Sequence, residues 1–278
     1  MGRVTTRRPV VRLSAGELPQ APRPDMLVVE EPLEIRVNGT ALAVTMRTPG
    51  HDVELALGFL VSEAVIRSAD DVVAARYCVD GRDEQGEQTY NVLDVTLAAG
   101  VALPVASMQR NVLTTSACGL CGRSSIEAVR TNSPYDVAKD DLSVTRDVLS
   151  ALPQTLRAQQ AVFDRTGGLH AVGLFRADGS LVAVREDVGR HNAFDKVVGW
   201  ALREERLPLS GHLAMVSGRA SFELVQKAQG AGIPLLAAVS APSSLAVDLA
   251  VESGMTLLGF VRGTSMNVYA GAHRISTE

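Results

Sequence analysis

The chain has few cysteines and no long apolar run. Only three of its 278 residues are cysteine, which argues against a disulfide-based fold and favours a reducing, cytoplasmic setting. No apolar stretch is long enough to span a bilayer, so no membrane partner is expected. Acidic residues (31) outnumber Lys and Arg (27), and a net charge of −4 offers no basic field for nucleic acid. The 46% apolar content predicts a soluble protein with a substantial core.

The N-terminus lacks the pattern of an export signal. The twin arginine Arg7-Arg8 is followed by Arg12, Glu17 and four prolines before any apolar segment can form. We therefore expect residues 1–23 to be a disordered tail.

Residues 24–106 have the pattern of a small α+β N-terminal subdomain. Apolar and polar residues alternate on both sides of Asn38-Gly39, the strongest short signal of a β-hairpin. Asp52 can cap a following helix, and His51 is then a residue of the capping region. Two more strands are expected near residues 76–79 and 91–97.

Residues 140–278 have a different pattern, in which helices and strands alternate. This order predicts an α/β domain with helices packed on a largely parallel sheet. Asp178-Gly179 adds a hairpin that supplies an antiparallel edge. Between the two domains, residues 107–139 show weak periodicity and are expected to form a mobile loop.

This loop contains a C-x-x-C motif, formed by Cys118 and Cys121. A glycine follows each cysteine and Arg123 lies two residues beyond, a setting that lowers the pKa of a thiol. The pair could also be core cysteines or half of a zinc site. Structural zinc needs four ligands, yet the only other cysteine is Cys78, and no second C-x-x-C or H-x-x-x-H is present. The sequence therefore favours a reactive thiol and no metal site.

Three predicted strands end in small, hydroxylic or cationic residues. In open α/β sheets, ligands bind beyond the carboxyl ends of strands, where glycines, helix N-termini and arginine can hold phosphate. Taken singly, each of these ends is also an ordinary turn or cap. Together they predict a phosphorylated ligand at Ser217-Gly218-Arg219, at Ser240–Ser244 and at Arg262-Gly263-Thr264-Ser265.

Charged and imidazole side chains gather at the strand-to-helix junction of residues 185–196. His191 and Lys196 are candidate site residues there, while Asp187 or Asn192 can serve as a helix cap. His170, in an apolar strand, can be either a core histidine or a site group.

With these motifs in this order, the chain resembles the FdhD family of sulfurtransferases, which are required to make active formate dehydrogenase. The resemblance covers residues 24–270. Its segments are Thr115–Gly122, Thr166–Ala171, Glu186–Ala193, Ser217-Gly218-Arg219 and Ser240-Ala241-Pro242.

The resemblance implies a cytoplasmic homodimer with a cytidine-deaminase-like α/β domain. Such proteins take sulfur from a cysteine desulfurase as a cysteine persulfide. They pass it to molybdenum bis(molybdopterin guanine dinucleotide), which then enters the catalytic subunit of formate dehydrogenase. Guanine nucleotides should bind as fragments of that cofactor. The persulfide falls on Cys118, with Cys121 left to resolve, assist or tune it. The cofactor-binding stretch falls on Phe260, Val261, Arg262, Gly263, Thr264 and Ser265.

Two other classes of function share features with this sequence. Zinc nucleoside deaminases also carry C-x-x-C, but they need H-x-E or C-x-E together with P-C-x-x-C. Here Ala117 replaces that proline, and no histidine is followed two residues later by Glu. A non-catalytic chaperone that only binds the cofactor, with passive cysteines, stays open as the alternative.

Overall fold

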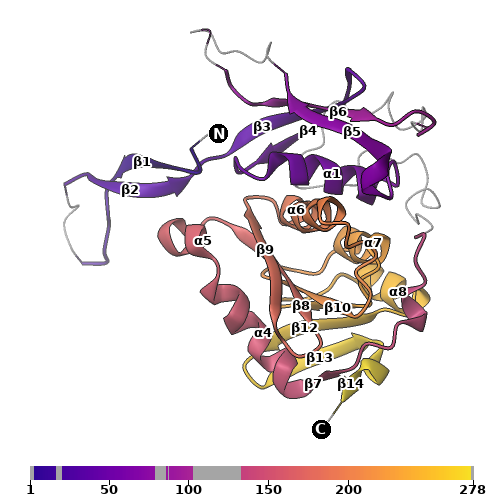
Figure 1. Cartoon of the computed structure of the whole chain (residues 1–278). Helices are drawn as coiled ribbons and strands as arrows, with labels where there is room; N and C mark the ends of the chain where they lie inside the picture. Colours follow the sequence, from indigo (N-terminus) through magenta and orange to yellow (C-terminus); the bar gives the residue numbers. More distant parts are fainter. Residues whose placement is uncertain (1–2, 17–20, 79–85, 87, 103–132, 277–278) are drawn as a thin grey trace.

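The computed structural model describes residues 3–16, 21–78, 86, 88–102 and 133–276 (Figure 1). Cys118 and Cys121, with most of the predicted loop over residues 107–139, lie outside these ranges. The predictions made for the two cysteines therefore stay predictions. No helix in the described ranges is long and apolar enough to cross a membrane.

A four-stranded sheet and one helix form the N-terminal subdomain. The predicted hairpin is confirmed: Asn38 and Gly39 both have positive φ, 50° and 79°, in the turn between two antiparallel strands. The sheet has the order β4-β3-β6-β5. Its elements are β3 (Glu31–Val37), β4 (Thr40–Arg47), α1 (Asp52–Ser62), a 3₁₀ turn (Ala69–Asp71), β5 (Val72–Tyr77) and β6 (Val92–Leu97).

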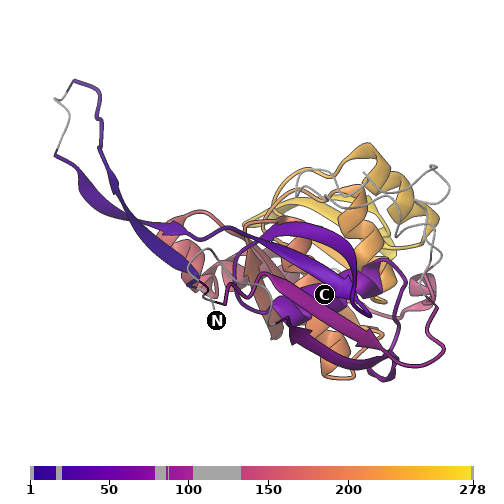
Figure 2. The ribbon, with the colours of Figure 1, turned by 90° about the horizontal axis from the view of Figure 1, so that it is seen from above.

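Ahead of this subdomain, β1 (Thr5–Val10) and β2 (Arg23–Val28) pair as an antiparallel ribbon that projects from the body (Figures 1 and 2). This differs from the disordered tail expected over residues 1–23. The prediction of a disordered tail rested on the prolines of this segment. Two of them, Pro9 and Pro24, face each other in the ribbon. Both strands are edge strands, and edge strands tolerate a residue that cannot donate a hydrogen bond.

The C-terminal domain is built on a six-stranded mixed sheet, which confirms the predicted α/β class. The sheet order is β13-β12-β11-β10-β8-β9. The β10–β11 and β11–β12 pairings are parallel, and the antiparallel β8–β9 pairing is the predicted Asp178-Gly179 hairpin. The expected largely parallel sheet was wrong for β8–β10 and β12–β13, which are antiparallel. Its strands are β8 (His170–Arg176), β9 (Leu181–Asp187), β10 (His212–Val216), β11 (Leu235–Ala238), β12 (Thr256–Arg262) and β13 (Ser265–Ala270).

Helices cover both faces of this sheet because its strand residues alternate between two buried sides. One side packs under α6, α7 and α8 and continues into the N-terminal subdomain as one core; the other packs under α4. Leu174 of β8 belongs to the first side and Phe175 to the second, both fully buried. The helices are α4 (Arg146–Ala158), α5 (Ala161–Thr166), α6 (Arg190–Arg203), α7 (Phe222–Gly230) and α8 (Ser244–Glu252).

The two domains meet where α1 crosses α6 (Figure 1). Gly58 of α1 and Gly199 of α6 lie at the crossing. A Cβ atom built on Gly58 would fall 1.8 Å from the Asp195 carbonyl oxygen, and one on Gly199 would fall 1.8 Å from the Glu54 carbonyl oxygen. The helices therefore touch backbone to backbone, an approach that only glycine permits.

Residues 133–145, which follow the cysteine-bearing segment, are held by contacts with the C-terminal residues 274–276. A 3₁₀ turn (Val137–Lys139) and β7 (Val144–Thr145) lie here, and β7 pairs with β14 (Ile275–Ser276). The buried Arg274, in the 3₁₀ turn Ala272–Arg274, donates to the carbonyl oxygens of Val137, at 2.6 Å, and Ala138, at 3.2 Å. The end of the described chain thus holds the start of the C-terminal domain in place.

Candidate functional site

A crevice of about 450 Å³ opens at the carboxyl ends of β10 and β11. Ser217 and Val239, the residues that follow these two strands, form part of its lining. The second half of α4, the turn through Gly167 and Gly168, and single residues of α5, β8 and the segment after β9 form the rest. The crevice therefore lies where the parallel strand order predicted a ligand.

The ends of β10 and β11 lie beside each other, and Ser217, from the predicted site after β10, lines the crevice. Ser217 accepts a hydrogen bond at 2.8 Å from the backbone N–H of Ala171, so its hydroxyl proton is left to donate. Gly218 packs against His170: a Cβ there would fall 3.2 Å from His170 Nδ1. Arg219 is exposed. Of these three residues Ser217 lines the crevice, and their binding of phosphate stays a prediction.

His170 belongs to the crevice and not to the closed core. Burial lowers the pKa of its imidazole, and the nearby Arg190 and His191 lower the pKa further. The ring is consequently neutral near pH 7 and presents one donor and one acceptor. The structure therefore excludes the closed core for His170, and its role as a site group stays a prediction.

The predicted cofactor-binding stretch Phe260–Ser265 is divided by the fold. The sequence had suggested that a helix N-terminus at the end of β12 could hold phosphate. Instead, β12 turns through Gly263-Thr264 into β13, so its end offers no helix N-terminus. Val261 is fully buried, whereas Phe260 is 36% exposed, with a φ of 53°.

Arg262 places this stretch next to the crevice. Its Nε donates at 3.3 Å to the carbonyl oxygen of Val239, a residue of the crevice lining, and its guanidinium lies 5.8 Å from the centre of the Phe260 ring. Gly263 and Thr264 instead line a separate cavity of about 460 Å³ at the N-terminus of α4. Arg262 thus contacts a residue of the crevice lining, while Ser265 opens β13 and is exposed.

His191 lies at the start of α6 and contacts the start of α7. Its Nε2 is 2.8 Å from Glu223 Oε2 and 3.1 Å from Ser221 Oγ. Burial would raise the pKa of Glu223, but the hydrogen bond and charge of His191 outweigh it and lower the pKa. No group of three His, Cys, Asp or Glu side chains arranged as metal ligands occurs in the described ranges.

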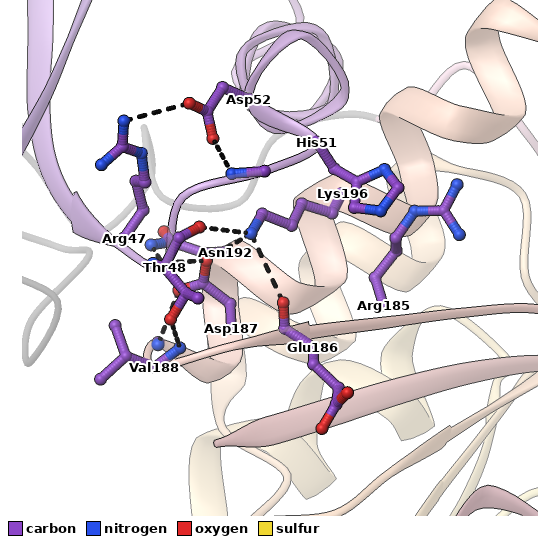
Figure 3. A network of polar contacts seen from close by, with 12 residues as sticks. Arg47, Thr48, His51, Asp52, Arg185, Glu186, Asp187, Val188, Asn192 and Lys196 are labelled. Carbon is purple, nitrogen blue, oxygen red and sulfur yellow. Dashed lines mark hydrogen bonds and ion pairs between the residues drawn. The ribbon is translucent and has the colours of Figure 1, made fainter. Parts of the chain in front are cut away.

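Lys196 is buried between the two domains (Figure 3). Its side chain is 1% exposed, and its ammonium group contacts Asp187 Oδ2 at 2.6 Å, the carbonyl oxygen of Thr48 at 3.0 Å and that of Glu186 at 3.4 Å. Three acceptors match the three protons of an ammonium group. Lys196 therefore makes a structural contact that joins the domains, and its predicted contact with a cofactor stays a prediction.

The rest of the charged junction serves the same purpose. Asp187, fully buried, also accepts from the backbone N–H groups of Thr48 and Gly189, and Asn192 bonds both Asp187 and the Met46 carbonyl (Figure 3). Asp187 and Asn192 were predicted as helix caps. Asp187 does bond Gly189, the N-cap residue of α6. Both side chains also reach across the domain boundary: Asn192 bonds Met46 of β4, and Asp187 bonds Thr48, the residue after β4.

Arg185 and Glu54 form a second ion pair across the domain boundary. The Arg185 guanidinium donates a hydrogen bond to each Glu54 carboxylate oxygen, from Nε to Oε2 at 2.5 Å and from Nη2 to Oε1 at 2.9 Å. His51 Nδ1 lies 3.1 Å from Glu54 Oε2. Burial would raise the pKa of Glu54, but the hydrogen bonds of Arg185 and His51 lower the pKa from 4.5 to about 2. The carboxylate is therefore charged over most of the acid range.

This pair predicts an acid-dependent loss of stability. A carboxyl whose folded pKa lies below its unfolded pKa stabilises the fold above the unfolded value of 4.5, and this contribution is lost as pH falls toward 2. Glu54→Gln should lower the free energy of unfolding by about 3 kcal/mol at neutral pH and reduce its slope below pH 4.5. Urea unfolding at a series of pH values measures both effects. Glu34→Gln, a change in the partly exposed pair with Arg36, should keep the wild-type slope.

Sequence reasoning missed Gln160. It sits between α4 and α5, lines the crevice and is only 3% exposed. The sequence gave no signal for Gln160, because neither the turn between α4 and α5 nor the burial of a polar side chain can be read from periodicity. The nearby Gly167-Gly168 was part of the quoted family motif.

These features define a mixed α/β protein with a ligand crevice at its strand ends and a domain interface built from its most charged motif. Comparison with known proteins agrees with this description. A sequence profile of the FdhD/NarQ family matches residues 28–276. The chain belongs to the FdhD/NarQ family.

Individual relatives extend the match to almost the whole chain. A protein of Nocardia farcinica named "Sulfur carrier protein FdhD" is 61% identical over 275 residues, 99% of this chain and 96% of that protein. One of the same name from Streptomyces avermitilis is 61% identical over 279 residues, covering 99% and 97%. A crystal structure from Desulfotalea psychrophila, described as a formate dehydrogenase accessory protein, has a TM-score of 0.75 at 22% identity and covers 99% of this chain and all of that one. The last likeness concerns the fold alone.

Proposed function

We propose that this protein is a sulfur carrier that accepts persulfide sulfur from a cysteine desulfurase on Cys118. It then passes the sulfur to molybdenum bis(molybdopterin guanine dinucleotide) for formate dehydrogenase. The observation that carries the proposal is the 61% identity, over nearly the full length, to two proteins named as sulfur carriers. From the family resemblance, we also propose that the protein is a cytoplasmic homodimer and that its C-terminal domain is cytidine-deaminase-like.

The chemistry of the first step suits a C-x-x-C thiolate. The Cys118 thiolate attacks the terminal sulfur of the donor persulfide, the donor S–S bond breaks, and the donor cysteine leaves as a thiolate. A new S–S bond on Cys118 now holds the transferred sulfur, and no external oxidant is needed. Cys121 is placed three residues away to resolve, assist or tune this persulfide.

The crevice supports the second half of the proposal. It lies at strand ends that offer the Ser217 hydroxyl, the neutral His170 ring and, next to it, the exposed Arg262. No Asp or Glu occurs among its described lining residues, so an anionic ligand meets no opposing carboxylate. The cofactor is cargo in this scheme, and the crevice with Arg262 would hold it while sulfur is delivered.

A sulfur-loading assay tests the proposal. The purified protein is mixed with a cysteine desulfurase and L-cysteine and measured by intact-mass spectrometry. We expect an added mass of about 32 Da, one sulfur atom, that a reducing thiol removes. A protein that binds guanine nucleotide but never gains this mass would be the non-catalytic chaperone instead.

A further inference from the structure

We propose that the β1–β2 ribbon is a docking arm that binds an acidic surface on the protein that receives cargo from the crevice. The inference rests on the proposed function, because it takes from that function a cargo that is handed to a second protein. It goes beyond the function by assigning the element that holds the recipient and the charge of the surface that this element recognises.

The ribbon projects from the body and leaves most of its residues exposed (Figures 1 and 2). Its two strands pair with each other in a sheet of their own, and its main contact with the body is that of β2 with α5. A two-stranded ribbon is only marginally stable in water, because it has little apolar surface to bury. Val11, Leu13 and Leu27 are nevertheless 51, 72 and 40% exposed. A second protein that covers these side chains would therefore stabilise the ribbon.

The ribbon also differs in charge from the rest of the chain. Residues 3–28 contain five arginines and two acidic residues, a net charge of +3, whereas the other residues contain 22 basic and 29 acidic ones, a net charge of −7. All five arginines are exposed, and none forms an ion pair within the described part of the chain. Guanidinium groups bind carboxylates through two parallel hydrogen bonds, so the ribbon matches an acidic surface. The arginines are Arg3, Arg7, Arg8, Arg12 and Arg23.

The charge of the body favours a protein as the partner over a nucleic acid or an anionic membrane. Both of these are extended polyanions, and a body with a net charge of −7 repels them as they approach the ribbon. A protein surface can supply carboxylates for the arginines and apolar contacts for the exposed apolar side chains in one interface. We therefore assign the ribbon to an acidic protein.

The base of the ribbon lies against the wall of the crevice. β2 ends at Val28, and a Cβ built on Gly168, which lines the crevice, would fall 3.1 Å from Val28 Cγ1. The next residue, Val29, donates to the Val4 carbonyl oxygen at 2.9 Å and closes the base. From this point the six-residue strands extend outward by about 20 Å, at roughly 3.4 Å per residue. A protein held by the ribbon is thus next to the crevice, which is the place for a recipient.

Binding of the full chain to the cofactor-free catalytic subunit of a formate dehydrogenase tests this assignment, with affinity measured by biolayer interferometry. We expect Arg7→Glu combined with Arg8→Glu to weaken binding about tenfold or more, because two carboxylates then face an acidic surface. Arg67→Glu combined with Arg76→Glu is the matched control. It makes the same change of charge at exposed positions of the N-terminal subdomain and should bind as the wild type does. Lysine at residues 7 and 8 keeps the charge and should retain most of the affinity.

Several results would overturn the assignment. Unchanged affinity in the Glu variant is one, and an equal loss in the Lys variant is another, since it would show that charge is not what the partner recognises. If the Glu variant instead loses binding to the cysteine desulfurase alone, the ribbon docks the sulfur donor. If it changes from dimer to monomer in analytical ultracentrifugation, the ribbon holds a second copy of this chain.

Sulfur loading, measured by intact-mass spectrometry, separates this assignment from the carrier function. Loading by the desulfurase should be unchanged in the Glu variant, because the change is confined to the ribbon and leaves the C-x-x-C motif intact. If the wild-type chain loads sulfur but does not bind the dehydrogenase subunit, the docking assignment and the delivery step both fall, while the first step of the proposed function stands. If the wild-type chain binds the subunit and never loads sulfur, the carrier function falls and the docking assignment is decided by the variants.

Discussion

Alanine at Cys118 is expected to abolish sulfur loading, whereas alanine at Cys121 should leave it measurable. Only a thiolate can attack the sulfane sulfur of a donor persulfide, and the family resemblance places that thiolate on the first cysteine of the motif. Loss of Cys118 removes the attacking atom itself, so the expected effect is complete and not graded. Loss of Cys121 changes only the environment of the persulfide.

Intact-mass spectrometry after incubation with a desulfurase measures the outcome on each variant. Cys78→Ala is the control, because Cys78 follows β5 in the N-terminal subdomain, outside the C-x-x-C motif, and its loss should leave loading unchanged. Loading that survives in Cys118→Ala and disappears in Cys121→Ala would exchange the two roles. Loading in the variant that lacks both would contradict any mechanism through C-x-x-C.

Alanine at Gly199 is expected to destabilise the whole protein by about 3 kcal/mol or more. The added Cβ would lie 1.8 Å from the Glu54 carbonyl oxygen, and both groups are fixed in helices, so neither can move aside alone. To make room, α1 and α6 must separate. Their separation disrupts the core that the two domains share and strains the Lys196 and Arg185 contacts beside it.

Gly230→Ala is the matched control for this effect. Gly230 also lies in a helix, α7, but a Cβ built on it meets nothing within 4 Å. Because alanine favours a helix over glycine, this variant should be as stable as the wild type or more stable, by up to about 1 kcal/mol. Thermal unfolding of both variants gives the comparison. An unfolding temperature for Gly199→Ala equal to that of Gly230→Ala would show that the helices can part at little cost.

The elements that sequence periodicity predicted are those stabilised locally. The Asn38-Gly39 hairpin, the helix that begins at Asp52 and the helix–strand alternation after residue 140 are all present. The antiparallel partner β13 was missed because its residues, largely exposed at a sheet edge, carry little apolar alternation. The β1–β2 ribbon was missed because its prolines outweighed its β-branched residues.

The candidate site was predicted less completely, since its parts come together only in the tertiary structure. Ser217 and His170 lie on elements that periodicity located, and both line the crevice. Lys196 has the charge expected of a site residue, but its burial against Asp187 depends on how the two domains dock, which no local pattern encodes. Gln160 is distinctive only through its burial, and burial at a turn is a property of the finished fold.

The bonds made by Arg274 also set an order of events during synthesis. Residues 272–276 are among the last described residues to leave the ribosome, yet Arg274 and β14 secure residues 137–145, made more than a hundred residues earlier. The contacts that follow the cysteine-bearing segment can therefore form only after Arg274 has been synthesised. A nascent chain stalled before Arg274 would have its C-x-x-C motif already synthesised but would lack these contacts.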